Sequence, residues 1–173
     1  IYLNRAGGAD FDSPLALLID FAGNDRYSAN LESSQGSGIF GIGILADLQG
    51  DDTYVGARLT QGTGIAGTGI LIDAAGSDEY VGQEYAQGAG VWGLGILWDR
   101  DGQDNYRADL YAQGFGGARA TGLLLDKLGL GSKQDEPDEA GGGEEEASSE
   151  EGVEEAAKSA LFDLLKGKDK DKD

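Results

Sequence analysis

Residues 73–80 read Asp-Ala-Ala-Gly-Ser-Asp-Glu-Tyr, and the segment Gln-Gly-Ala-Gly follows at 87–90. Three other stretches repeat this frame, in which a leading aspartate precedes a Gly-x-Asp-x-Tyr unit and a later Gln-Gly pair. The leading aspartates are Asp20, Asp47, Asp73 and Asp99, followed by Asp126 in a copy that breaks off. Their spacing of 26 or 27 residues makes the chain a tandem array.

A single copy of the repeat cannot bury its own apolar side chains, because its short β-type runs, such as 68–72 and 79–81, are separated by Gly/Asp turns. A fixed period of this length is typical of solenoids and propellers, in which stacked copies share a core. We therefore predict an all-β fold, a β-solenoid (β-helix) of about five 26-residue coils with two or three strands per coil. The alternative is a meander of hairpins closed into a barrel.

Glutamine and glycine also recur in columns. Gln35, Gln61, Gln87 and Gln113 are each 26 residues apart, and glycines follow every one of them. In a solenoid, equivalent residues lie about 4.8 Å apart along the axis. We expect the glutamines to form amide-to-amide hydrogen bonds along this ladder, and the glycines to let opposing faces pack closely.

Composition narrows the functional classes. The chain has 173 residues, 31 glycines, no cysteine and no histidine, so it lacks a disulfide framework and the commonest general base and zinc ligand. Its net charge of −19 would repel nucleic acid and attract cations. No apolar run approaches the ~20 residues of a membrane helix, so we predict no membrane span.

The composition changes abruptly after Gly131. We predict the solenoid at 1–131, a disordered acidic linker at 132–152, an amphipathic helix at 153–167 and a charged tail at 168–173. So short a helix is marginal alone in water, and its leucine stripe needs a surface. We expect the helix to pack on the open end of the solenoid, with docking to another protein as the alternative.

The Gly-x-Asp-x-Tyr unit resembles part of the calcium-binding nonapeptide repeat of RTX proteins, Gly-Gly-x-Gly-x-Asp-x-U-x, in which U is apolar or aromatic. The matching residues are Asp25, Asp52, Asp78 and Asp104, with Tyr27, Tyr54, Tyr80 and Tyr106 at the U position. This resemblance implies that carboxylates and carbonyls of stacked turns hold calcium between coils. It covers about five residues per copy, and other residues, such as Asp73-Ala74, replace the leading glycine pair.

The array is also similar to Gly/Asp-rich repeats of uncharacterised secreted bacterial proteins. In addition, the sequence begins inside a repeat and contains no methionine. We therefore interpret the chain as a piece of a larger, exported bacterial protein, located in the extracellular space, at the cell surface or in the periplasm.

Two aspartate columns are candidate metal ligands on physical grounds alone. Stacking would bring like charges about 5 Å apart, which costs on the order of a kcal/mol or more per neighbour. Calcium would offset this repulsion, because it accepts about six to eight oxygen ligands in loose geometry. Alternatively, each aspartate accepts backbone N–H groups of its own turn and needs no ion, and both roles can coexist. The candidate ligands are Asp20, Asp25, Asp47, Asp52, Asp73, Asp78, Asp99 and Asp104.

Aromatic residues offer a second functional option. The aromatic-containing columns are Tyr85, Tyr111, Leu59 and Ser33; Trp92, Phe40 and Ala66; and Trp98, Ile72 and Ala46. A row of exposed aromatics could stack on sugar rings. These columns exchange aromatic with aliphatic residues, however, as core positions do, so we expect core or oligomer contacts.

We do not expect catalysis, because each aspartate recurs in every copy whereas a catalytic site must differ from its neighbours. The patterns favour a structural or interaction module that calcium stabilises through its aspartate ladders. A carbohydrate-binding solenoid is the alternative, followed by a polysaccharide-active enzyme on the same fold.

Overall fold

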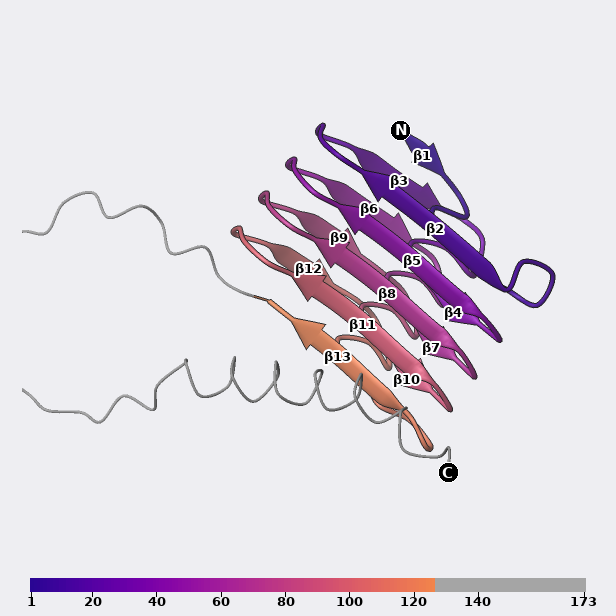
Figure 1. The fold of residues 1–173 in the computed structure, drawn as a ribbon. Helices are drawn as coiled ribbons and strands as arrows, with labels where there is room; N and C mark the ends of the chain where they lie inside the picture. Colours follow the sequence, from indigo (N-terminus) through magenta and orange to yellow (C-terminus); the bar gives the residue numbers. More distant parts are fainter. Residues whose placement is uncertain (127–173) are drawn as a thin grey trace, which may run out of the picture. The chain divides into compact units, whose positions relative to one another are not determined.

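The computed structural model describes residues 1–126, which wind into a stack of parallel coils (Figure 1). The predicted linker, amphipathic helix and tail lie outside these residues. Within the described part there is no helix that is long and apolar enough to cross a membrane. The strands are β1 (Tyr2–Leu3), β2 (Leu15–Asp20), β3 (Arg26–Ala29), β4 (Gly38–Ile39), β5 (Ile42–Asp47), β6 (Thr53–Gly56), β7 (Gly64–Ile65), β8 (Thr68–Asp73), β9 (Glu79–Val81), β10 (Gly90–Val91), β11 (Leu94–Asp99), β12 (Asn105–Arg107) and β13 (Thr121–Leu125).

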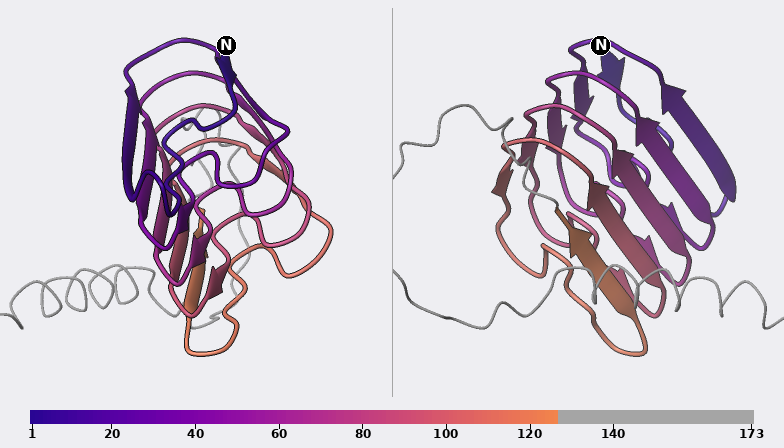
Figure 2. Two further views of the ribbon diagram at one scale, coloured as in Figure 1. Left: turned by 90° about the vertical axis from the view of Figure 1, so that its right-hand side faces the viewer. Right: turned by 60° about the vertical axis from the view of Figure 1, so that its left-hand side comes forward.

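The strands form three parallel sheets that face one another across a narrow interior (Figure 2). Sheet A has the order β1-β3-β6-β9-β12, sheet B the order β4-β7-β10, and sheet C the order β2-β5-β8-β11-β13. The chain passes from sheet C to sheet A, then to sheet B, and returns to the next strand of sheet C. This topology confirms the β-solenoid of about five coils and shows three strands in each complete coil. The hairpin barrel is wrong, because its neighbouring strands would run antiparallel.

The register places each residue beside its equivalent one repeat away. In sheet C, Asp73 lies between Asp47 and Asp99, and every other position of the strand is matched in the same way. In sheet A, the tyrosines stack with their ring centroids 4.8 Å apart, which is one strand spacing. The stacked tyrosines are Tyr2, Tyr27, Tyr54, Tyr80 and Tyr106.

The glutamine column is buried, but its amides do not bond to one another as predicted. Gln61 donates from Nε2 to the carbonyl oxygen of Tyr54 at 3.0 Å and to that of Val81, in the next coil, at 2.9 Å. Gln35 and Gln87 make equivalent pairs of bonds. Buried main-chain carbonyls need hydrogen-bond donors. The side-chain N–H groups of the glutamines donate to these carbonyls and are therefore not available to the neighbouring glutamine amides. The Oε1 atoms of the same glutamines are left without a partner.

The core is a stack of inward-facing side chains, to which each complete coil contributes one leucine from sheet C and one tyrosine from sheet A. Residues of the sheet C strands alternate between the interior and the outside, so Leu45, Leu71 and Leu97 are fully buried. They pack in one cluster with the tyrosine stack of sheet A. Because every coil contributes the same pair of large side chains, the core continues through the coils without a gap between repeats.

The aromatic columns, for which we expect core or oligomer contacts, lie outside the core. Trp92 is 64% exposed, Phe40 63%, Tyr111 45% and Trp98 42%. Trp98 points outward from sheet C, and the others lie at bends between strands. Within a single chain, these outward positions accept both aromatic and aliphatic residues, because no core surrounds their side chains.

Glycine is required where sheets B and C come close together. A Cβ built on Gly64 would lie 2.0 Å from the carbonyl oxygen of Leu94, which is far inside van der Waals contact. Gly38 and Gly90 in the same column meet carbonyl oxygens at 2.0 and 2.3 Å. Gly116 ends this column, and the nearest atom to its Cβ would be 3.4 Å away. The column therefore contains three crowded positions and one open position.

We predict that Gly64→Ala lowers the free energy of unfolding by about 1–3 kcal/mol or more, because the backbone of the next coil must shift. Gly116→Ala, the matched control, should be neutral or raise it by up to about 1 kcal/mol through the unfolded state. Urea unfolding followed by tryptophan fluorescence measures both. Equal losses in the two variants would contradict the close approach of the sheets.

Candidate metal centre

The two aspartate columns meet at the corner between sheets C and A. Each leading aspartate ends a strand of sheet C, and the aspartate of the Gly-x-Asp-x-Tyr unit directly precedes a strand of sheet A. The glycine of the turn between them has a positive φ, for example 149° at Gly50 and 154° at Gly76. A Cβ on Gly76 would lie 1.6 Å from the carbonyl oxygen of Gly50. Only glycine fits this turn when copies stack at one strand spacing.

The first column, Asp20, Asp47, Asp73 and Asp99, binds the tyrosine stack. The hydroxyl of Tyr54 donates to Oδ2 of Asp73 at 2.6 Å, and Asp47 and Asp99 accept Tyr27 and Tyr80 at 2.5 and 2.8 Å. Oδ1 of Asp73 accepts the N–H of Ala75, as expected for an Asx turn. The turn role considered as the alternative to a metal is therefore present at Asp20, Asp47 and Asp73.

The last coil departs from this pattern. The sequence frame places Tyr106 with Asp126, but the Tyr106 hydroxyl donates to Oδ2 of Asp99 at 3.0 Å. Asp99 thus accepts two tyrosines, whereas its Oδ1 has no partner. The regular array of carboxylates therefore ends at Asp99 and Asp104 within residues 1–126.

The second column, Asp25, Asp52, Asp78 and Asp104, links successive coils. Oδ1 of Asp78 accepts the backbone N–H of Asp52, one coil earlier, at 2.7 Å, and the neighbouring pairs bond in the same way. Oδ2 of Asp52, Asp78 and Asp104 is buried without a hydrogen-bond partner. Asp52 and Asp78 are only 2% exposed. A buried carboxylate oxygen without a donor is costly, so these atoms need a proton or a cation.

The columns converge into groups of three carboxylates. In each group, one oxygen from each residue lies within 4.8 Å of the others. The groups are Asp20, Asp25 and Asp47; Asp52, Asp73 and Asp78; and Asp78, Asp99 and Asp104. All eight residues that the sequence predicted as metal ligands belong to a group, and Asp78 belongs to two.

Positive charge is scarce around these groups. Among residues 1–126, the ion pairs are Arg5 with Asp10, Arg58 with Glu32 and Glu84, and the N-terminal ammonium with Asp25 at 3.9 Å. Only the last involves an aspartate of the two columns, and it reaches only the first group. Inside the array, the negative charge is therefore not balanced by arginine or lysine of the described residues.

Burial raises the pKa of the carboxyls in the two inner groups, and neighbouring carboxylates raise it further. The pKa is raised to about 6 for Asp99, about 7 for Asp73, about 8 for Asp52 and about 9 for Asp78. Donation from the tyrosine hydroxyls opposes the increase at Asp73 and Asp99. Without a cation, part of this corner would hold protons at neutral pH.

The sequence did not reveal the tyrosine–aspartate bonds. We had assigned the tyrosines only to an apolar or aromatic position. The available signal is that this column is tyrosine in every copy and never phenylalanine or an aliphatic residue. A hydroxyl kept at every copy of an aromatic position indicates a specific polar contact. The seven-residue spacing does not identify its partner, because Tyr54 donates to Asp73 of the next coil and not to Asp47.

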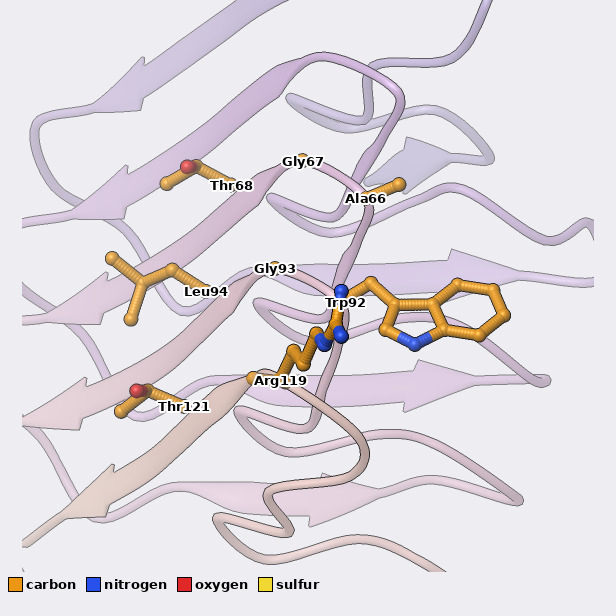
Figure 3. A pocket seen from close by; sticks show the side chains of 9 residues that line it. Ala66, Gly67, Thr68, Trp92, Gly93, Leu94, Arg119 and Thr121 are labelled. Carbon is orange, nitrogen blue, oxygen red and sulfur yellow. The ribbon is translucent and has the colours of Figure 1, made fainter.

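A separate hollow lies on the outside of the coils, where sheets B and C meet (Figure 3). Thr68, Leu94 and Thr121 are stacked along it, and the Trp92 ring projects beyond its edge. Its only charged lining residue is Arg119. The hollow therefore lacks the paired carboxylates that the corner provides, and it offers no acid–base pair for catalysis.

We predict that the metal-free protein loses stability as pH rises from about 5 to about 8.5. The folded-state pKa values of Asp52, Asp73, Asp78 and Asp99 exceed the unfolded value of about 3.9, so the folded state binds more protons in this window. The free energy of unfolding in urea with a chelator should fall by about 2 kcal/mol or more. The pair of changes Asp52→Asn and Asp78→Asn should flatten this dependence, and a stability that rises with pH would contradict it.

Comparisons with known proteins leave the site to be interpreted from its own geometry. No family model matches the chain, and neither the curated proteins nor the solved structures contain a significant match. Function must therefore be inferred from the exposed surfaces of the three sheets and from the corner between sheets C and A. We call this corner, where the two aspartate columns meet, the aspartate corner.

Proposed function

We propose that the chain is a structural module of a larger, exported bacterial protein, in which calcium bound at the aspartate corner locks successive coils together. The observation that carries this proposal is the unpartnered Oδ2 of Asp52 and of Asp78, both 2% exposed and both inside groups of three carboxylates. A cation between coils would give these oxygens a partner and offset the repulsion within each column.

The donor set favours a hard cation. Every candidate ligand is a carboxylate, and the chain contains no histidine and no cysteine. Oxygen-only sites suit calcium and magnesium, whereas zinc and copper prefer nitrogen and sulfur. Calcium fits better than magnesium because it accepts irregular geometry, and three oxygens within 4.8 Å of one another do not by themselves define an octahedron.

Repetition favours a structural role over catalysis. The tyrosine–aspartate bonds and the carboxylate-to-backbone bonds recur at each junction between complete coils. Such bonds stiffen a rod, whereas a catalytic site needs one residue that is unlike its equivalents. Calcium sites in extracellular modules bind with Kd of about 0.1–1 mM, so an exported protein would find them occupied where calcium is plentiful.

We expect calcium to raise the midpoint of thermal unfolding at pH 8, since it binds the folded corner and not the unfolded chain. At a concentration of 100 times Kd, each site adds about 2.7 kcal/mol. The gain should be smaller at pH 5, where protons compete for the same oxygens. Titration calorimetry, together with thermal unfolding in calcium or chelator, measures both effects.

The matched variants are Asp78→Asn, which removes a charge shared by two groups, and Asp109→Asn, which removes an exposed charge outside them. Calcium stabilisation should shrink in the first and persist in the second. Binding heat and unfolding midpoints that are unchanged by calcium at pH 8 would rule out the ion and leave protonated carboxyls as the way the corner is satisfied.

One observation supports carbohydrate binding as a second candidate. Tyr85 and Tyr111 stack with ring centroids 5.1 Å apart, Phe115 packs beside them, and Tyr111 is 45% exposed. Such a platform at a corner of the coils suits a sugar ring. A glycan-array signal that Tyr111→Ala abolishes and Phe40→Ala preserves would favour this function, since Phe40 is exposed elsewhere.

A further inference from the structure

The proposed function does not use the outer surface of sheet C. It presents every second residue of five strands, starting from Leu15 in β2, Ile42 in β5, Thr68 in β8, Leu94 in β11 and Thr121 in β13. We call this surface the C face. Its own residues are aliphatic apart from two threonines and one tryptophan and are uncharged, although the chain has a net charge of −19. At its edge, the guanidinium carbon of Arg100 lies 5.7 Å from the centroid of the Trp98 ring.

The C face is accessible and large in the described residues. Leu15 is 71% exposed, Leu17 61%, and Trp98 42%. Five strands at about 4.8 Å and six residues at about 3.3 Å give a flat area of roughly 400 Å², before the height of the side chains is counted. This is the size of the largest apolar patch on a typical monomer, and such patches mark interaction sites.

The C face is complementary to itself. The parallel register aligns its side chains in columns along the solenoid axis, and one column contains Ile19, Ala46, Ile72, Trp98 and Leu125. Its smallest member, Ala46 in β5, and its largest, Trp98 in β11, lie one strand to either side of β8. A two-fold axis along β8, between two facing copies, would place Trp98 of each copy over Ala46 of the other.

The same two-fold axis also opposes side chains of compatible size in the other columns of the C face. It sets Leu15 against Thr121, Ile42 against Leu94, and the central Thr68 against itself. Large side chains thus oppose small ones, or residues of medium size oppose one another, as close packing requires. Apart from Arg100 at its edge, this face offers a charged partner nothing to pair with, so the chemistry favours a second apolar surface of the same shape.

We propose that two copies of this chain associate through their C faces, about a two-fold axis parallel to β8, with Trp98 of one packed on Ala46 of the other. Two flat faces of roughly 400 Å² give roughly 800 Å² in total, which is below the standard interface size and in the range of weak, transient contacts. Both partners are also strongly acidic, so the dimer is a weak one. Its Kd is in the micromolar range and falls when salt screens the repulsion between the copies.

Sedimentation equilibrium of the full chain at constant calcium concentration, from about 1 to 500 µM, tests this proposal. Ile70→Glu, at the centre of the C face, should abolish the dimer. Val81→Glu, which makes the same change in charge on the outside of sheet A, should leave Kd within about threefold. Circular dichroism establishes that each variant keeps its β-sheet signal.

A size swap tests the orientation. Trp98→Ala leaves a void and Ala46→Trp makes a clash, so each should weaken the dimer by about tenfold or more. The double variant exchanges the two side chains and should recover a Kd near that of the parent. Failure of the double variant to recover would overturn the proposed two-fold.

A chain that stays monomeric throughout this concentration range would overturn the dimer itself. If Trp98 is nevertheless shielded from an aqueous quencher, a segment outside residues 1–126 covers the face instead. A dimer that persists in Ile70→Glu would show that the copies associate through another surface.

Discussion

Every feature of the described molecule follows from one constraint: each residue of a coil lies one strand spacing from its own equivalent. In a parallel stack with matched register, a favourable side chain is therefore repeated as a favourable column, and an unfavourable one as an unfavourable column. Aromatic rings gain from this arrangement, because the tyrosines stack at 4.8 Å. Carboxylates do not, because identical charges repel at the same separation.

The corner between sheets C and A reconciles these tendencies. The Tyr54 hydroxyl and two backbone N–H groups donate to three of the four carboxylate oxygens of Asp73 and Asp78, and Oδ2 of Asp78 has no partner. Most carboxylate oxygens of this corner thus have a hydrogen-bond partner within the fold. The remaining buried oxygens need a proton or a cation. The same set of aspartates thus forms the turns and leaves open the oxygens on which the proposed ion binding rests.

Sequence reasoning succeeded where repetition alone decides the outcome. The 26-residue period was enough to predict stacked coils, and identity within columns was enough to gather all eight aspartates at one corner. Sequence reasoning failed where the outcome depends on whether a side chain points into or out of the coil. Ile70 and Leu71 are both aliphatic and both repeat in column, yet Leu71 is buried and Ile70 faces outward. The strands of sheet C carry apolar residues on both faces, so no alternation of polar and apolar residues indicated which side is the C face or that Trp98 is exposed. The partners of Gln61 are backbone carbonyls, which the sequence does not specify.

The three corners of the coil also differ in how strictly their length is fixed. From the leading aspartate to the tyrosine the distance is seven residues in each of the four copies that carry both. The extra residue of the first copy falls between Tyr27 and Gln35, and that of the last between Gln113 and Asp126. Among these copies, loop length thus varies only away from the corner between sheets C and A. For protein engineering, those two corners are the places to graft peptide loops, whereas an insertion at the aspartate corner would disrupt the stack.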